Sequence, residues 1–437
     1  MALLITDAEI DGRRRDLWVD DGRIVAQGTA TDVIDARGGA LLPGFVDHHL
    51  HLHALAAARR SVHAGRSRED LAAALRHATP DPTGWIRVVG SDDDVLDAAT
   101  LDRFRADVPV RVQHRSGAMW VLNTAALTRI GPCDHPGVDR DPHGDPTGRL
   151  LRADDWLRDR LPRAGPPDLH DLGRELAGYG ITAVTDATPD LDARAAASLA
   201  TVPQRLTLLG VPLGAGAPPG TTVGPYKIAL ADHDLPTPDA LAERIREAHT
   251  AGRPVAVHSV TRESLVLLLV AFDTAGRMPG DRVEHAALVP TELIPPLAGL
   301  AVVTQPGFLA DRGDLFRREV PADEHSDLYR CRSLRAAGVA VALSSDAPYG
   351  PVDPWVVLRA ASTRRTIDGT TLGPAEVLTP RDALHALQAP TPGARPRVLR
   401  PGDAADLVLL HVPLDEALRQ PDRDLVRTTF IGGRRLT

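Results

Sequence analysis

Between residues 40 and 394, short apolar segments alternate with longer segments that carry helix signals. Alternating strand and helix patterns are typical of parallel βαβ units and predict an α/β fold. We predict eight strands here, at residues 40–47, 181–185, 205–210, 226–230, 254–258, 282–285, 301–304 and 339–344. One intervening helix, predicted over 237–252, opens with Thr-Pro-Asp and closes with Gly, which are ordinary start and stop signals.

The two ends of the chain instead show short apolar segments separated by Gly-containing turns. These segments are residues 3–5, 17–19, 23–26, 405–410 and 428–431. Because the few strands at either end cannot form a core alone, we expect them to pair with each other. The pattern therefore predicts one small β-sandwich domain built from residues 1–45 and 395–437, with residues 46–394 as the larger domain.

The composition narrows the class of protein. A length of 437 residues suits one large domain with a smaller one, and 43% hydrophobic with 25% charged residues is ordinary for a globular protein. The net charge of −8 provides no basic surface for a polyanion. Nucleic acid is therefore not an expected partner.

Cysteine usage and apolar runs indicate the compartment. Cys133 and Cys331 are too few for a disulfide framework, and the N-terminus turns acidic before a signal-peptide core could form. The longest apolar run, 265–272, is far shorter than the ~20 residues of a membrane-spanning helix. We expect it to be a buried helix, and we expect a cytoplasmic protein without a membrane partner.

The densest group of candidate ligands is Gly44 to His53, Gly-Phe-Val-Asp-His-His-Leu-His-Leu-His. Successive side chains of a strand alternate between its faces, so Asp47, His49 and His51 should point the same way. Two imidazoles at positions i and i+2 can bind one divalent cation of the zinc type, at roughly 2.0 to 2.1 Å. The alternative is a His-rich strand end without a ligand.

Lys227 is the only lysine of the chain, because the 50 basic residues comprise 49 Arg and this single Lys (50 − 1 = 49). Arg offers no primary amine and is never deprotonated, whereas a buried lysine can react as a nucleophile. The pattern favours a chemical role for Lys227, with chance as the alternative.

These residues resemble the amidohydrolase superfamily over nearly the whole chain. The motif Gly-Phe-Val-Asp-x-His-x-His is followed by Lys227, His258 in Val-Ala-Val-His-Ser, His285 in Val-Glu-His-Ala and Asp346 in Leu-Ser-Ser-Asp-Ala-Pro. Within the superfamily the chain looks most similar to the metal-dependent amidases that include N-substituted formamide deformylases. The segments that carry this likeness are His114-Arg115-Ser116-Gly117 with Trp120 and Asn123, Gly180–Asp186, and Gln305-Pro306.

The resemblance implies a (β/α)8 TIM-type barrel with metal at the carboxyl ends of its strands. It implies two divalent ions, Zn²⁺ or other divalent metals, with His49, His51 and Asp346 on the more buried ion and His258 and His285 on the other. Lys227 would bridge them as a carboxylated lysine. A hydroxide held by the metal would be the nucleophile, and Asp346 would be the catalytic residue that moves the proton.

The long gap between the first two predicted strands indicates an insertion at about 80–170. Its segments 85–89 and 110–114 look extended. We expect it to lie over the barrel mouth and to select substrates, and the alternative is a decoration on the outer wall. Arg115, Trp120 and Gln305 are the candidate substrate-binding residues, with Asn123 similar, and His48 and His53 could support the metal ligands.

The predicted function is hydrolysis of an amide-type, non-peptide C–N bond in a small molecule such as an N-formyl or N-acyl compound. A mononuclear zinc deaminase of a heterocycle is the first alternative, although Glu263 is out of step with the acid that deaminases place after the fifth-strand His. The second alternative is a non-catalytic barrel used as a binding module, which would be expected to lack a ligand residue. The sequence is compatible with a homo-oligomer and does not identify the substrate.

Overall fold

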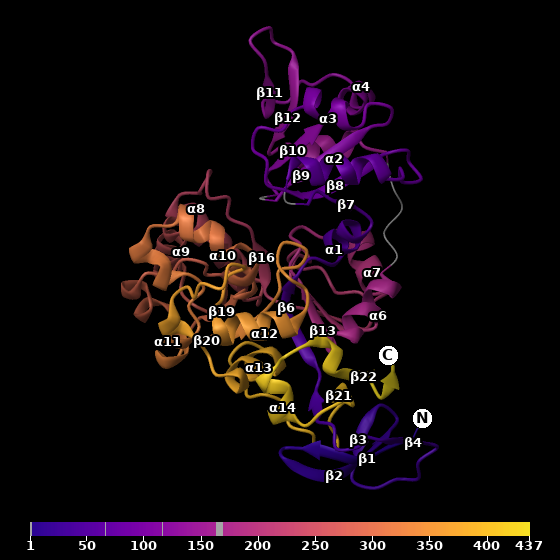
Figure 1. Ribbon diagram of the computed structural model, residues 1–437. Coiled ribbons are helices and arrows are strands. Elements are labelled where there is room, and N and C mark those ends of the chain that lie inside the picture. The colour runs from indigo at the N-terminus through magenta and orange to yellow at the C-terminus, as the bar shows by residue number, and fades with distance from the viewer. Residues whose placement is uncertain (1, 66, 116, 163–168) are drawn as a thin grey trace. The chain divides into compact units, whose positions relative to one another are not determined.

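The computed structural model describes residues 2–65, 67–115, 117–162 and 169–437, except for the side chain of Asp155. These residues form two compact units (Figure 1). The first unit is Met1–Leu52 with Asp168–Thr437, and the second is His53–Pro167. Within the described part of the chain, no helix has the length and apolarity that crossing a membrane requires.

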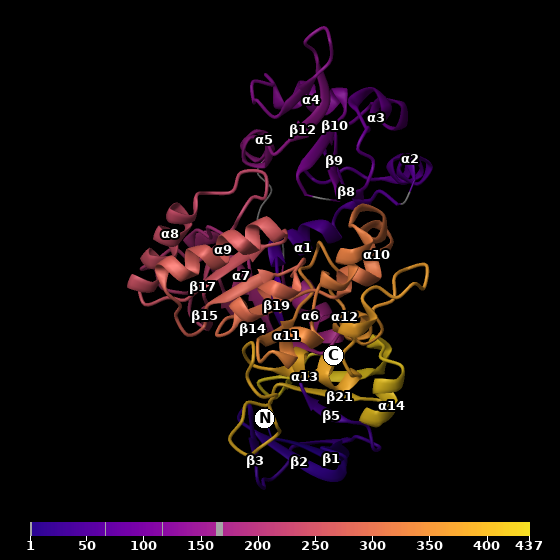
Figure 2. The ribbon, with the colours of Figure 1, turned by 90° about the vertical axis from the view of Figure 1, so that its left-hand side faces the viewer.

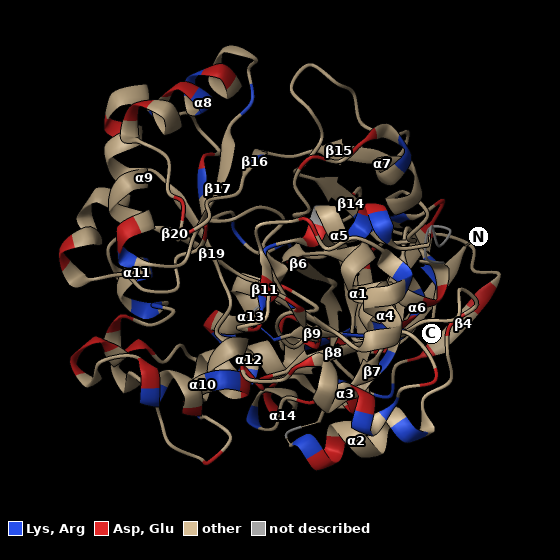
Figure 3. Ribbon diagram, turned by 90° about the horizontal axis from the view of Figure 1, so that it is seen from above, with Lys and Arg blue, Asp and Glu red and all other residues tan. Residues whose placement is uncertain are grey.

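The first unit contains two parallel sheets, with strand orders β15-β14-β13-β6 and β16-β17-β18-β19-β20. The strands are β6 Phe45–Leu50, β13 Ile181–Asp186, β14 Arg205–Leu208, β15 Thr221–Val223, β16 Tyr226–Ile228, β17 Val255–Ser259, β18 Arg282–His285, β19 Ala301–Thr304 and β20 Ala340–Leu343. The helices of this unit are α6 His170–Gly178, α7 Ala193–Leu199, α8 Pro238–Thr250, α9 Arg262–Ala275, α10 Gly307–Glu319, α11 Arg332–Ala336, α12 Pro354–Thr363 and α13 Pro380–Gln388. Four 3₁₀ turns join them: η1 Thr291–Leu293, η2 Pro295–Leu297, η3 Ala322–Asp327 and η4 Pro374–Glu376. Helices α8, α9 and α11 lie outside the strands of the larger sheet (Figure 3).

The strands predicted from 181 onward are all present, but the strand predicted over 40–47 is wrong as one element. The chain forms β5 Leu41–Pro43 and then β6, and these belong to different sheets. Gly44 separates them, and a Cβ atom there would lie 2.2 Å from the side chain of Thr182. The break therefore needs a residue without a side chain, so that the chain can pass against β13.

The chain termini contribute two sheets, of orders β3-β2-β1-β4 and β23-β22-β21-β5. All their strand pairs are antiparallel except β1 with β4. Their elements are β1 Leu3–Ile10, β2 Arg13–Asp20, β3 Arg23–Val25, β4 Asp32–Asp35, α14 Leu414–Arg419, η5 Arg423–Leu425, β21 Leu407–Leu410, β22 Val426–Ile431 and β23 Arg434–Arg435. Strand β21 pairs with β5, and Ile5, Leu41, Leu407 and Phe430 belong to one buried apolar cluster. The yellow C-terminal strands accordingly lie beside the indigo N-terminal ones (Figures 1 and 2).

Local sequence signals explain where the helices begin and which face they bury. Thr237 caps α8 by accepting a hydrogen bond from the backbone N–H of Ala240, as its Thr-Pro-Asp start predicts. Helix α9 contains the apolar run 265–272, but Val266 and Val270 are 42% and 44% exposed. The prediction of a buried helix is therefore wrong for one of its faces, because only the side with Leu265, Leu268 and Phe272 is buried.

The second unit is built on one six-stranded sheet of order β11-β12-β10-β9-β8-β7. Its elements are α1 Leu52–Arg59, β7 Val62–His63, α2 Arg68–His77, β8 Ile86–Ser91, α3 Ala98–Phe104, β9 Val110–His114, β10 Met119–Leu122, α4 Thr124–Ile130, β11 Val138–Arg140, β12 Pro146–Leu151 and α5 Asp154–Arg160. The segments predicted to be extended at 85–89 and 110–114 correspond to β8 and β9. Val88 of β8 and Val112 of β9 belong to one apolar cluster, and Trp85, just before β8, belongs with Trp120 of β10 to a second.

Candidate metal centre

His49 and His51 lie at the carboxyl end of β6. His49 is fully buried inside that strand, and His51 follows its last residue with a side chain that is 18% exposed. Because they are two positions apart in the sequence, both imidazoles reach the same end of the sheet, with ring centroids 5.4 Å apart. The prediction that the two rings come together is confirmed.

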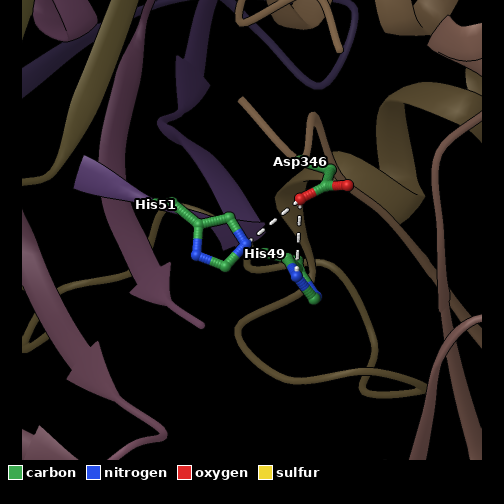
Figure 4. Close-up of side chains that lie close together, drawn as sticks. All are labelled: His49, His51 and Asp346. Atoms are coloured by element: carbon green, nitrogen blue, oxygen red, sulfur yellow. Dashed lines mark ion pairs between the residues drawn. The ribbon is translucent and has the colours of Figure 1, made fainter. Parts of the chain in front are cut away.

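Asp346 meets both imidazoles from the segment that follows β20. Its Oδ1 lies 3.6 Å from Nε2 of His49 and 3.4 Å from Nε2 of His51 (Figure 4). The backbone N–H of Asp346 donates to the carbonyl of His49 at 2.8 Å. One candidate ligand atom from each of the three residues lies within 4.8 Å of the other two.

Two atoms of this group lack hydrogen-bond partners despite their burial. Among the described residues, His49 Nε2 and Asp346 Oδ1 are buried and unpartnered, yet they face each other. Leaving a buried polar atom unpaired is costly unless something else satisfies it. Two imidazole nitrogens and a carboxylate oxygen form a donor set that suits zinc, so the residues present fit a divalent cation.

The other predicted ligands come from the carboxyl ends of neighbouring strands. Lys227 lies in β16, His258 in β17 and His285 at the end of β18. The ring of His285 lies 4.7 Å from that of His49 and 4.4 Å from that of His258, between centroids. Lys227 is 5% exposed and faces the charges of Glu284 and Asp346.

Burial and mutual repulsion disfavour the charged forms of the His49, His258 and His285 imidazoles. Burial lowers the pKa of His49 well below its usual value, and it lowers the pKa of His258 to about 4 and of His285 to about 3. Burial also lowers the pKa of Lys227, against the attraction of Glu284 and Asp346. For Asp346, burial raises the pKa, but the close approach of His51, at 3.4 Å, and of the His285 and His49 rings holds it below its usual value. Neutral imidazoles and an ionised carboxylate are the forms that bind metal.

Three of the imidazoles have a partner on Nδ1. Nδ1 of His49 contacts Oε2 of Glu284, Nδ1 of His51 lies 3.3 Å from Oγ1 of Thr188, and Nδ1 of His285 lies 3.0 Å from Oε1 of Gln305. Such partners set the tautomer of a ligating histidine. Sequence reasoning missed Glu284 and Thr188. An acidic residue inside the apolar strand 282–285 could have signalled Glu284, since a buried carboxylate needs a partner.

Two residues of this group have an uncommon backbone conformation. His285 and Asp346 both have left-handed backbones, with φ of 70° and 54°. This conformation is uncommon outside glycine and clusters at functional sites. It supports a functional role for these two residues.

Asp47 and His48 do not join the ligand atoms. The carboxylate of Asp47 accepts hydrogen bonds from Oγ and N–H of Ser345, at 2.5 and 3.2 Å, and burial raises its pKa to about 6. The ring of His48 is 3.1 Å from the carbonyl of Ala389. Asp47 therefore positions the segment before Asp346, and the expectation that its carboxylate joins the imidazoles of His49 and His51 is wrong.

The structure gives two of the predicted substrate-binding residues internal roles. Gln305 is fully buried, and its amide donates to the carbonyl of Val303 and to Oγ of Ser344 while its oxygen faces His285. Trp120 is 6% exposed within an apolar cluster, and its indole N–H donates to Asp154 at 2.8 Å. These contacts differ from the substrate contacts that the sequence suggested, because they use the polar groups inside the fold.

The remaining candidates lie in the second unit. Asn123 is fully buried and caps α4 by accepting from the N–H of Ala126, so its role is structural. Arg115 is half-buried, with its N–H donating to the carbonyl of Ser91 at 2.7 Å. Ser116 lies outside the described residues, and His53 also belongs to this unit.

The chain is similar in sequence and in fold to known proteins. The chain is 26% identical to an N-substituted formamide deformylase of Arthrobacter pascens, over 95% of this chain and 93% of that protein. Its fold is similar to those of two uncharacterized metal-dependent hydrolases of known structure. The one from Pyrococcus horikoshii has a TM-score of 0.72 at 19% identity, covering 98% of this chain and 99% of that one. The one from Pyrococcus furiosus has a TM-score of 0.71 at 18% identity, covering 94% and 99%.

The matching family model carries the description "amidohydrolase family" and spans residues 32–437, which includes every candidate metal ligand. Together with the structural neighbours, it identifies an α/β fold of the TIM-barrel type. The candidate site of His49, His51 and Asp346 fits the metal dependence of such enzymes. The chain is an enzyme that belongs to the amidohydrolase family.

Proposed function

We propose that this enzyme hydrolyses an amide-type, non-peptide C–N bond of a small molecule such as an N-formyl or N-acyl compound. The observation that carries the proposal is the meeting of His49, His51 and Asp346, whose ligand atoms lie within 4.8 Å of one another. The similarity to the N-substituted formamide deformylase of Arthrobacter pascens supports the choice of bond.

His49, His51 and Asp346 would hold one divalent cation, most suitably Zn²⁺, and His258 and His285 a second. A carboxylated Lys227 would bridge them, and its burial among these residues supports this assignment. When bound, the cations supply Lewis-acid polarisation of the scissile carbonyl and a water of lowered pKa. His49, His51 and His285 would hold these ions through Nε2, because their Nδ1 atoms face Glu284, Thr188 and Gln305.

Asp346 would move the proton. Its carboxylate is held ionised, so it can accept the proton of the attacking water and deliver it to the leaving nitrogen. The left-handed backbone at Asp346, with its N–H fixed on the carbonyl of His49, keeps the carboxylate aimed at the ligand atoms. Preorganisation of this kind preserves the geometry that proton transfer requires.

The proposed architecture is one closed (β/α)8 barrel over residues 46–394, with a sandwich of residues 1–45 and 395–437. Two backbone hydrogen bonds support closure: Lys227 N–H to the carbonyl of Leu209, and Asp346 N–H to that of His49. The apolar cluster shared by β1, β5, β21 and β22 supports the sandwich. The insertion at about 80–170, most of which belongs to the second unit, would select the substrate.

A metal count tests this proposal. Protein purified without chelator is analysed by inductively coupled plasma mass spectrometry and is then screened against N-formyl and N-acyl compounds, with amine release as the readout. We expect about two divalent ions per chain and turnover that chelator abolishes. One ion per chain with ammonia release from heterocycles would favour a deaminase, and protein without metal or turnover would refute the proposal.

A further inference from the structure

Glu284 is a fully buried carboxylate beside the candidate metal ligands. Its Oε2 contacts Nδ1 of His49, a residue 235 positions earlier in the chain. Its Oε1 lies 2.5 Å from Nε of Arg282, which is itself only 4% exposed. The carboxylate therefore stands between a buried guanidinium and a metal-ligand imidazole.

The path of β18 explains how Glu284 and His285 can both reach His49. Neighbouring side chains of a regular strand point to opposite faces, so one of the two should turn away. His285 instead has a φ of 70°, which breaks the alternation at the strand end. As a result Glu284 contacts the Nδ1 side of His49, while the ring of His285 lies 4.7 Å from the His49 ring.

The contact fixes which nitrogen of His49 carries the proton. A carboxylate accepts hydrogen bonds, so Nδ1 of His49 must donate, and Nε2 then keeps its lone pair. Nε2 is the unpartnered atom that faces Asp346 Oδ1 at 3.6 Å. The opposite tautomer would place a proton between these two atoms, where a cation belongs.

Arg282 keeps this arrangement in place. An isolated carboxylate at full burial would be strongly disfavoured, and the adjacent guanidinium compensates its charge. A second nitrogen of Arg282, Nη2, donates to the carbonyl of His48 at 3.3 Å. The pair is thus attached to β6 at the residue that precedes His49.

We propose that Glu284 is the positioning residue of the metal centre: by accepting from Nδ1 of His49 it selects the tautomer and ring orientation that present Nε2 to the cation. This inference rests on the proposed function, because it takes His49 as a metal ligand. Removing a partner of this kind lowers metal affinity by about 10- to 100-fold.

The test measures metal affinity directly. Zn²⁺ dissociation constants are determined by competition with a chromophoric chelator for the wild type and for Glu284→Gln, together with the absorption spectrum of the Co²⁺ form. We expect affinity to fall about 10- to 100-fold and the Co²⁺ spectrum to change. Equal affinity and an unchanged spectrum would overturn the inference.

Two further proteins separate positioning from general stability. Glu376→Gln is the matched control, because Glu376 is also a buried partner of an arginine, Arg330, at 3.1 Å, but contacts Cys331 and Ser333 instead of a metal ligand. It should lower the melting temperature and leave metal affinity unchanged. Arg282→Met combined with Glu284→Gln removes both charges of the pair, so it avoids an unpaired buried guanidinium and should still bind metal weakly. Wild-type affinity in this double variant would overturn the inference.

A measurement on the wild type covers the case in which the variants do not fold. In wild-type protein labelled with ¹³C and ¹⁵N, the His49 ring is assigned through its bonds to the backbone and should carry its proton on Nδ1, and protonation on Nε2 would overturn the inference. This readout uses metal-free protein. A wild type that binds no metal would therefore refute the proposed function while the tautomer still decides the role of Glu284.

Discussion

Asp346→Asn is the substitution that most directly tests the proposed chemistry. Asn keeps the size of the side chain and one oxygen, but it cannot accept and deliver a proton. Oδ1 of Asp346 lies 3.6 Å and 3.4 Å from the two Nε2 atoms, so an Asn oxygen in the same position would retain part of the ligand set. Metal content should therefore fall less than activity.

The magnitude follows from the loss of proton transfer. Removing a general acid–base lowers the rate by about 10² to 10⁴, which corresponds to roughly 2.7 to 5.4 kcal/mol in the activation free energy. A second effect comes from His285, whose Nδ1 lies 3.8 Å from Oδ2 of Asp346. In the variant, an amide N–H₂ group placed at Oδ2 would face a nitrogen that already donates to Gln305, which disfavours that rotamer.

The assay compares kcat and kcat/KM on the best compound from the N-formyl and N-acyl screen, with metal counted in the same preparations. Asp281→Asn is a suitable control, because Asp281 is a buried carboxylate just before β18 that accepts from Val255 N–H and pairs with His249 at 3.0 Å. We expect this control to lose stability but to keep kcat. If Asp346→Asn turned over at nearly the wild-type rate with full metal content, the assignment of Asp346 as the proton carrier would be wrong.

Three further predictions address the bridge, the termini and acid stability. Lys227→Arg should fold, but because it cannot form a carbamate it should hold about one metal ion and lose most activity. Lys227→Glu supplies a carboxylate and should recover part of the metal content. Identical metal counts and rates in these two variants and the wild type would exclude the two-metal mechanism. Deleting residues 401–437 removes Leu407 and Phe430 from the cluster that contains Ile5 and Leu41, so the remainder should be insoluble on expression, and a soluble active truncation would contradict the sandwich. In the metal-free protein, burial lowers the pKa of His258 to about 4 and of His48 and His285 to about 3. Between about pH 6.5 and pH 4 these three histidines therefore bind more protons in the unfolded chain than in the folded one. Their contribution to stability falls as pH falls through this range. Each of these histidines contributes up to about 1.4 kcal/mol per pH unit to the free energy of unfolding, and Asp47 with its raised pKa offsets part of the loss. Urea unfolding of chelator-treated protein measures this free energy. A value that does not decline from pH 7 to pH 5 would refute the reasoning.

The sequence by itself determined most strands of the larger domain and the candidate ligands that follow them. Strand positions are set by local apolar runs such as 181–185 and 301–304, and these signals need no knowledge of the rest of the chain. His49 and His51 are two residues apart on one strand, so their shared direction is also a local property. Asp346, after its own apolar strand, joins them because parallel strands end at a common edge.

Only the tertiary structure decided the partners of these ligands. Glu284 and His49 are 235 positions apart, and Gln305 and His285 are 20 apart, so their contacts depend on the register between strands and on the left-handed turn at His285. Composition could not separate Trp120 as a core residue from Trp120 as a substrate contact, because an aromatic side chain serves either role and only its surroundings distinguish them. Local pattern thus sets which residues reach the strand ends, whereas the nitrogen that each imidazole presents is set by packing between distant segments.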